Sequence, residues 1–181
     1  MLIIRKSKIS GCYLISHPIF RDHRGFLTKI FSDDLNKYLN NKKIKQINYS
    51  LTKKKHSIRG LHYQNPCPEY KIVKCLDGKI FDVVVDLRKN SKTFLRHERF
   101  IIDSNSSSIL VIPENCAHGY QTLKPSCKIL YFHTNNYYPQ HSKGLYYKDP
   151  ILGIKWPHKA SNLSDNDKSL KLIKDIKFKG L

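Results

Sequence analysis

The chain has 181 residues, of which 40% are hydrophobic, and its 33 Lys and Arg against 14 Asp and Glu give a formal net charge of +19. This length and composition predict one globular domain over residues 1–181, and the absence of an apolar run of about 18 residues excludes a transmembrane helix. The apolar run at the N-terminus is too short for a signal peptide, so we expect a cytoplasmic protein.

The positive charge predicts an anionic partner. Nucleic acid is the first class to consider, but the lysines are scattered, and no helix-turn-helix, RNA-recognition or zinc-finger pattern accompanies them. A small anionic ligand such as a nucleotide diphosphate is the better explanation. We therefore expect neither a nucleic-acid partner nor a membrane partner.

The first predicted elements are short. After an extended entry over residues 1–19, a turn with Gly25 as its turn residue is predicted to lead into a strand. Asp33 or Asp34 can cap a short helix that ends near Asn40.

Residues 46–51 alternate between polar and apolar side chains, which predicts a half-buried strand. The polar face of this strand carries Gln46, Asn48 and Ser50. Three hydrogen-bonding side chains on one face are compatible with solvent and with a polar cavity, and the pattern alone does not separate the two.

Residues 70–76 and 79–87 are predicted to form a hairpin around Asp77-Gly78. In its second strand, Asp82 and Asp86 lie on the face opposite an apolar one formed by Phe81, Val83, Val85 and Leu87.

Further short strands are predicted at residues 100–102, 108–112, 120–123 and 128–134. Turn residues separate them at the short intervals typical of an all-β sandwich or barrel rather than of βαβ units. From Ser164 onward a capping serine and an apolar pattern predict a short C-terminal helix.

The stretch from Ser57 to Gln64 combines Arg59-Gly60 with His62. Arginine grips phosphate well, glycine lets the backbone approach a ligand, and a nearby histidine can transfer protons. The simpler interpretation is a strand with one inward, hydrogen-bonded histidine.

Other chemistries have weak support. The nine histidines contain no HxH spacing, so a metal held by His62, His118 and His133 would depend on an accident of the fold. No serine lies in a GxSxG turn. The five cysteines contain no CxxC pair, as is typical of a reducing compartment, and no disulfide is expected among Cys12, Cys67, Cys75, Cys116 and Cys127.

Proton transfer remains, with His62 as a base, Tyr131 as an acid and Lys71 opposite developing negative charge. Taken singly, each is better explained as a core histidine, a half-buried tyrosine or a solvated lysine. Together they belong to an ordered series of motifs within about residues 18 to 170. The series is Arg59-Gly60-Leu61-His62-Tyr63-Gln64, Lys71-Ile72-Val73-Lys74, Asp82-Val83-Val84-Val85-Asp86-Leu87-Arg88, Ile112-Pro113-Glu114, Ala117-His118-Gly119-Tyr120, Leu130-Tyr131, Tyr137-Tyr138, Asp149-Pro150 and Gly153-Ile154-Lys155-Trp156-Pro157.

In this order and spacing, the chain resembles the dTDP-4-dehydrorhamnose 3,5-epimerase family of the cupin superfamily. The resemblance implies an all-β cupin jelly-roll sandwich or barrel, with an extended N-terminal segment and a few short peripheral helices. It also implies a homodimer with exchanged N-terminal segments, no metal and no cofactor. The substrate would be a nucleotide diphosphate sugar with a ketone at C4, inverted at C3, C5 or both.

The C4 ketone acidifies the protons on C3 and C5, so inversion needs a base on one face and an acid on the other. By resemblance, His62 is the base and Asp167 orients it, with Asp165 a close competitor. Tyr131 is the acid, and Lys71 holds the enolate oxygen. The implied substrate-binding residues are Arg59 at the diphosphate, together with Gln46, Asn48, His118, Tyr138, Arg24, Phe26 and Lys29.

Three positions depart from the family pattern. Lys29 stands where a glutamate of the nucleotide end is usual, Phe132 where a lysine is common, and Ser142 where a glutamate is usual. These differences make a GDP-linked 4-keto hexose or heptose a candidate beside the dTDP-linked sugar.

Two rival functions remain. A nucleotide-sugar 3,4-ketoisomerase of the same fold usually carries a second histidine closely after the first, where this chain has Tyr63 and Gln64. A non-catalytic basic cupin that binds an anionic sugar or nucleic acid would have no need of His62, Tyr131 and Lys71 together.

Overall fold

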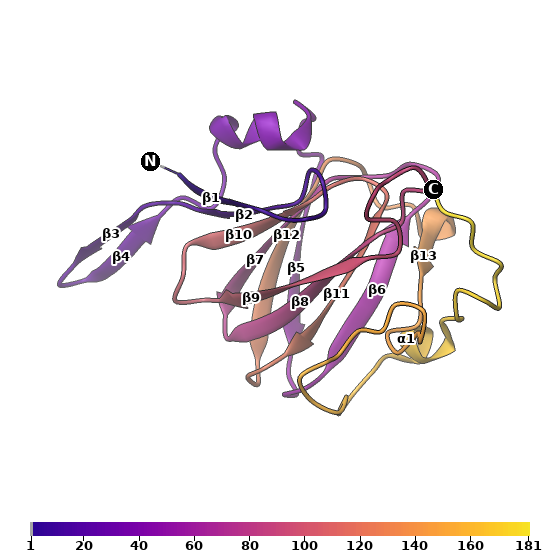
Figure 1. Ribbon diagram of the computed structural model, residues 1–181. Coiled ribbons are helices and arrows are strands. Elements are labelled where there is room, and N and C mark those ends of the chain that lie inside the picture. The colour runs from indigo at the N-terminus through magenta and orange to yellow at the C-terminus, as the bar shows by residue number, and fades with distance from the viewer. Residues whose placement is uncertain (1) are drawn as a thin grey trace.

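The computed structural model describes residues 2–181. Two antiparallel sheets face each other (Figure 1). Successive residues of each strand alternate between the inner and outer surfaces. The six-stranded sheet has the order β1 (Ile3–Lys6), β2 (Tyr13–Ser16), β10 (Ser108–Ile112), β7 (Lys71–Asp77), β12 (Cys127–His133), β5 (Gln46–Thr52). The five-stranded sheet has the order β13 (Ser142–Gly144), β6 (Ile58–Gln64), β11 (Cys116–Thr122), β8 (Lys79–Asp86), β9 (His97–Asp103). The predicted all-β jelly roll is confirmed.

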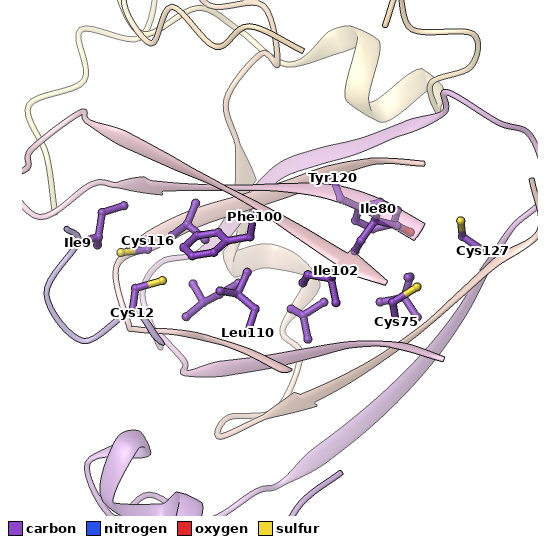
Figure 2. Close-up of a cluster of buried hydrophobic side chains, with 14 residues drawn as sticks. Ile9, Cys12, Cys75, Ile80, Phe100, Ile102, Leu110, Cys116, Tyr120 and Cys127 are labelled. Carbon is purple, nitrogen blue, oxygen red and sulfur yellow. The ribbon is translucent and has the colours of Figure 1, made fainter. Parts of the chain in front are cut away.

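Apolar side chains fill the space between the sheets at one end of the sandwich (Figure 2). Val73 and Leu110 from the six-stranded sheet meet Ile80 and Phe100 from the five-stranded sheet, and these four side chains are at most 2% exposed. Such close packing fixes the separation of the two sheets. The other end of the interior is therefore free to hold polar groups on a rigid frame.

The outer faces of both sheets are covered as well. The 3₁₀ helix η1 (Asp33–Leu39) packs Leu35 and Leu39 on the six-stranded sheet. On the five-stranded sheet, Leu145, Leu152 and Ile173 from the C-terminal region pack against the apolar residues of β6 and β8. Strands buried on both faces explain why β8 has apolar residues at consecutive positions, Val83 to Val85.

The predicted hairpin at Asp77-Gly78 is wrong, although both of its strands exist. β7 pairs with β10 and β12, whereas β8 pairs with β9 and β11, so the chain crosses from one sheet to the other at Gly78. Gly78 has φ +87°, and a Cβ there would lie 2.6 Å from Cys127 Sγ. Asp-Gly thus signals a turn with positive φ, but it does not determine which strands pair.

The N-terminal region is more regular than an extended entry. β1 and β2 form one edge of the six-stranded sheet, and β3 (Ile19–Asp22) pairs only with β4 (Gly25–Thr28). The β3–β4 hairpin, which we call the arm, projects away from the sandwich (Figure 1). Its turn is at residues 23–24 rather than at Gly25, and its apolar residues Phe20, Phe26 and Leu27 are exposed.

The predicted C-terminal helix exists but is only five residues long. α1 (Asp165–Ser169) begins after Ser164, whose Oγ accepts a hydrogen bond from Asp167 N at 3.1 Å. The apolar residues that follow, such as Ile173, pack without helical structure. The sequence pattern missed two elements that precede it, η2 (Pro139–His141) and β13. Within residues 2–181, no helix is long and apolar enough to cross a membrane.

Candidate active site

A cavity of about 560 Å³ opens between the two sheets at the polar end of the sandwich. β5, β7 and β12 form one wall, and β6 and β11 form the other. Six of the predicted site residues line it: Asn48, Arg59, His62, Lys71, His118 and Tyr131. The polar face of residues 46–51 therefore points into a cavity at Asn48 and Ser50.

Two glycines bring the backbones of β6 and β11 together beside Arg59. A Cβ on Gly60 would lie 2.6 Å from Gly119 Cα, and one on Gly119 would lie 2.7 Å from Arg59 O. The close approach that Gly60 allows is thus toward the neighbouring strand, whereas the sequence suggested an approach to a ligand. Arg59 Nε donates to Thr52 Oγ1 at 3.0 Å, which ties the guanidinium to the opposite sheet.

His62 is held by Asp167. Its Nε2 lies 2.5 Å from Asp167 Oδ1, and the His62 side chain is 38% exposed while that of Asp167 is 4% exposed. Asp165 instead pairs with Lys168 at 2.7 Å and is 98% exposed. Of the two aspartates that the sequence left open, only Asp167 contacts the imidazole.

The protonation of this pair follows from its contacts. Burial raises the pKa of Asp167, but hydrogen bonds with His62, Ser164 and the Gly60 backbone outweigh it and hold the pKa below its ordinary value. An ionised carboxylate only accepts hydrogen bonds, so His62 Nε2 carries the proton and Nδ1 presents a lone pair. His62 is thereby prepared to accept a proton at Nδ1.

His118 has its own carboxylate as well. His118 pairs with His62 across β6 and β11, and its Nε2 lies 2.7 Å from Asp82 Oδ2. Asp82 is fully buried, and burial raises its pKa, although His118 and Lys71 oppose the shift. The sequence placed Asp82 on the face opposite the apolar one of Phe81 and Val83, and in the structure the face with Asp82 is inside the sandwich, whereas Val83 packs in the outer layer.

Tyr131 projects from β12, on the wall opposite His62. Its ring lies edge-on to His118 with centroids 6.3 Å apart. Burial and the neighbouring Tyr120 hydroxyl raise the pKa of Tyr131 well above its ordinary value. The phenol therefore keeps its proton over the physiological range and can act as a donor.

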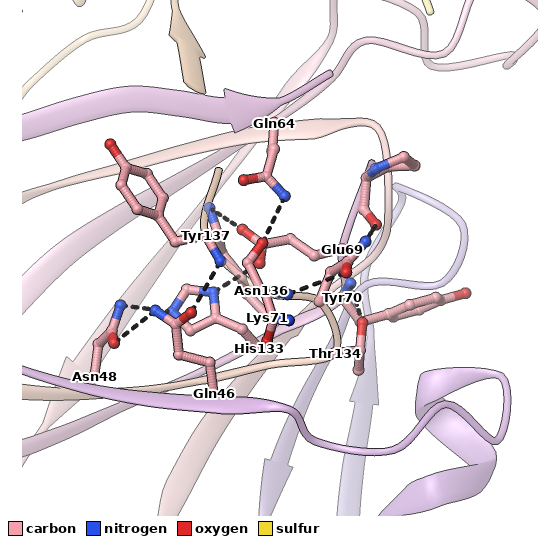
Figure 3. A network of polar contacts seen from close by, with 12 residues as sticks. Gln46, Asn48, Gln64, Glu69, Tyr70, Lys71, His133, Thr134, Asn136 and Tyr137 are labelled. Carbon is pink, nitrogen blue, oxygen red and sulfur yellow. Dashed lines mark hydrogen bonds and ion pairs between the residues drawn. The ribbon is translucent and has the colours of Figure 1, made fainter. Parts of the chain in front are cut away.

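The sequence did not single out Glu69, although it faces the cavity beside Lys71. Glu69 Oε1 lies 3.2 Å from Lys71 Nζ, and Glu69 Oε2 lies 2.9 Å from His133 Nδ1 (Figure 3). A signal was available, because residues two apart in extended chain share a face and Lys71 was already a candidate.

The remaining predicted residues are not in the cavity lining. Gln46 donates to Asn48 Oδ1 at 2.9 Å and accepts from the backbone of Tyr137. Tyr137, rather than Tyr138, lines the cavity. Arg24 and Phe26 lie on the arm, and Lys29 follows it, so all three are remote from the cavity of their own chain (Figure 1).

The departures from the family pattern have distinct positions. Phe132 is buried and stacks on Phe31 with centroids 5.7 Å apart, so it belongs to the packing under η1. Ser142 lines the cavity from β13. Among residues 2–181, no group of three His, Cys, Asp or Glu side chains is arranged to hold a metal ion.

Comparisons with known proteins agree on one family. The family model for dTDP-4-dehydrorhamnose 3,5-epimerase matches residues 6–175. A dTDP-4-dehydrorhamnose 3,5-epimerase from Salmonella typhimurium is 33% identical over 177 residues, which are 96% of each chain.

Solved structures share the whole fold. The Legionella pneumophila dTDP-6-deoxy-D-glucose-3,5-epimerase, in complex with dTDP-4-keto-L-rhamnose, superposes with a TM-score of 0.91 at 32% identity, covering 96% of this chain and 94% of that one. A 3'-monoepimerase from Streptomyces bikiniensis, in complex with dTDP-quinovose, gives 0.86 at 25% identity, with coverage of 95% and 90%.

The His62–Asp167 contact predicts a tautomer that NMR can detect. In ¹⁵N-labelled protein, neutral His62 should carry its proton on Nε2. Asp167→Asn replaces an obligate acceptor by an amide that can donate or accept, so both tautomers should be populated. Asp165→Asn, the matched control, should leave the His62 signals unchanged. A change in the His62 ¹⁵N signals that appears in Asp165→Asn and not in Asp167→Asn would contradict this geometry.

Proposed function

Since the chain belongs to the dTDP-4-dehydrorhamnose 3,5-epimerase family of carbohydrate epimerases, we propose that it inverts C3, C5 or both in a dTDP-linked 4-keto-6-deoxyhexose. The observation that carries the proposal is the placement of a base and an acid on facing walls. His62 projects from the five-stranded sheet and Tyr131 from the six-stranded sheet. A sugar ring between them has one group on each face.

The reaction begins when His62 Nδ1 removes a proton from the carbon next to the C4 ketone. The imidazolium that forms is stabilised by the Asp167 carboxylate on its other nitrogen. The electron pair of the broken C–H bond moves into the ketone, whose oxygen becomes an enolate oxygen facing the Lys71 ammonium. Tyr131 then delivers a proton to the carbon from the opposite face, and the centre is inverted.

The cavity has binding groups for the rest of the substrate. Arg59 holds the diphosphate, because a guanidinium matches phosphate oxygens in charge and geometry. Asn48 and Gln46 form a hydrogen-bonded pair beside His133, at the end of β5 away from Arg59, and His118 is held against the sugar by Asp82. Tyr138 follows the cavity residue Tyr137, and its backbone N donates to Oε1 of Gln64, which also lines the cavity, at 2.9 Å.

Thymine as the nucleobase of the substrate is supported by a relative, since the Legionella enzyme was solved with a dTDP-sugar. Lys29 favours a second candidate, a GDP-linked 4-keto hexose or heptose, because a cation replaces the carboxylate usual at this position. A lysine donates hydrogen bonds to a nucleobase, whereas a glutamate accepts them, so the identity of the nucleobase must be tested directly.

The functional unit is a dimer whose arms are exchanged. Phe20, Phe26 and Leu27 on the arm are 55–72% exposed, and so are Ile47 and Tyr49 on the edge strand β5, at 58% each. Exposed apolar surface of this extent is unfavourable in a monomer. The arm of a second copy covers it and brings Arg24, Phe26 and Lys29 to the mouth of the partner's cavity, beside Ile47 and Tyr49.

The proposed reaction can be tested with dTDP- and GDP-linked 4-keto sugars in deuterated water. We expect deuterium at C3 or C5 of the dTDP-sugar together with an epimer. His62→Asn should slow both by about two to four orders of magnitude, as removal of a general base does. Exchange with the GDP-sugar alone would overturn the assignment of thymine as the nucleobase. A product with its ketone at C3 would indicate the ketoisomerase. No exchange with either sugar would exclude the epimerase.

Tyr131→Phe should separate proton exchange from inversion. The variant keeps the ring and loses only the hydroxyl, so His62 can still form the enolate while the opposite-face proton arrives poorly. Deuterium should wash into recovered, uninverted substrate, whereas epimer formation should fall by roughly two orders of magnitude or more. If exchange falls as far as inversion, Tyr131 is needed to form the enolate and this assignment of roles fails.

Exchange of arms can be tested by complementation. His62→Asn lacks the base, and the triple variant Arg24→Ala, Phe26→Ala, Lys29→Ala lacks the arm contacts, so each should be nearly inactive alone. After unfolding and refolding of an equal mixture, the mixed dimers should each have one intact site, and about a quarter of the wild-type activity should return. A mixture that stays inactive would show that each arm serves its own chain.

A further inference from the structure

Glu69 is a carboxylate in contact with two other ionisable groups of the cavity wall. The side chains of Glu69, Lys71 and His133 are 10%, 14% and 12% exposed. Each oxygen of Glu69 has one partner, since Oε1 lies 3.2 Å from Lys71 Nζ and Oε2 lies 2.9 Å from His133 Nδ1 (Figure 3). The catalytic scheme above uses Lys71 but assigns no task to Glu69 or His133.

The backbone fixes Glu69 in this place. Tyr70 N donates to Thr134 Oγ1 at 2.9 Å, and Thr134 N donates to Tyr70 O at 3.1 Å, so Tyr70 is clamped to the end of β12. The Tyr70 side chain packs with the apolar cluster under η1. Because neighbouring residues of an extended segment point to opposite sides, Glu69 and Lys71 both face the cavity.

The hydrogen bonds around Glu69 are consistent in direction. Burial raises the pKa of Glu69, but the His133 hydrogen bond and the Lys71 charge outweigh it, so the pKa lies below its ordinary value. The ionised carboxylate only accepts, which puts the His133 proton on Nδ1 and leaves Nε2 to accept from Asn48 Nδ2 at 3.4 Å. Asn48 Oδ1 in turn accepts from Gln46, so the donors run from Gln46 through Asn48 and His133 to Glu69.

We propose that Glu69 is a positioning residue that holds the Lys71 ammonium and the His133 imidazole as one unit on the cavity wall. Lysine has a flexible four-carbon stem, and an ammonium that must first be ordered stabilises an oxyanion less than one already in place. This inference rests on the proposed function, which assigns Lys71 to the enolate oxygen. Glu69 itself acts through Lys71 and does not contact the reacting atoms.

Glu69→Gln is the sharpest variant, because it keeps the shape and removes the charge. A carboxamide has one accepting oxygen, so its NH₂ group must face either Lys71 Nζ or His133 Nδ1–H, and one of the two contacts becomes donor against donor. We expect kcat to fall roughly tenfold to a hundredfold, as misplacement of a catalytic group does, with KM changed much less. Glu69→Asp keeps the charge but reaches only one partner, so it should lose less.

The matched control is Glu114→Gln. Glu114 also pairs with a lysine, Lys42 at 2.5 Å, but this pair is outside the cavity, so kcat should be unchanged. Thermal unfolding and dTDP binding show whether each variant is folded. If Glu69→Gln is not, Glu69→Asp carries the test.

A double variant distinguishes positioning from other roles. If Glu69 acts only through Lys71, adding Glu69→Gln to Lys71→Ala should cause no further loss of kcat. Losses that multiply, or a Glu69→Gln enzyme as active as the wild type or more so, would overturn the inference. If Lys71→Ala is impaired and Glu69→Gln is fully active, only the role of Glu69 is contradicted. If Lys71→Ala is fully active, the role of Lys71 in the proposed function is contradicted.

Discussion

The arrangement of the cavity depends on one constraint, that an imidazole enclosed between two sheets needs a hydrogen-bonding partner. Each of the three histidines of the cavity wall has its own carboxylate: Asp167 for His62, Asp82 for His118 and Glu69 for His133. Unpaired buried charges are costly, and a pair in which both groups are fixed sets the tautomer of the ring. The carboxylates therefore determine which ring nitrogen can accept a proton.

The carboxylates come from different parts of the chain, and the fold has to bring them in. Asp82 is in β8, in the same sheet as His118, whereas Asp167 is on the short helix α1, within the C-terminal region that covers the five-stranded sheet. The apolar packing at the other end of the sandwich keeps the walls at a constant separation. The His62 imidazole on one wall and the Tyr131 phenol on the other thus remain at opposite faces of whatever lies between them.

The sequence predicted much of this. Short strands with turn residues indicated the all-β class, the bounds of β10 were correct, and the polar face of β5 was identified because these signals are local. Pairing is not local: Asp77-Gly78 joins two sheets rather than one hairpin, and the burial of Asp82 depends on β11 beside it. For Glu69 the short spacing to Lys71 was a usable local signal, but its second partner His133 is 64 residues away and could not be read from the sequence.

The contact between Gly60 and Gly119 fixes the path of β6 between Arg59 and His62. Neither glycine has room for a side chain, so the path of the backbone between Arg59 and His62 cannot relax toward β11. The pairing shifts register at this point, so three steps along β6, from Arg59 to His62, match two steps along β11, from Tyr120 to His118. This bulge lets Arg59 and His62 face the same cavity although an odd number of residues separates them. Under the proposed function, a ligand held by Arg59 at its diphosphate and by His62 at its sugar is therefore selected by the number of phosphates between the two, as well as by its stereochemistry.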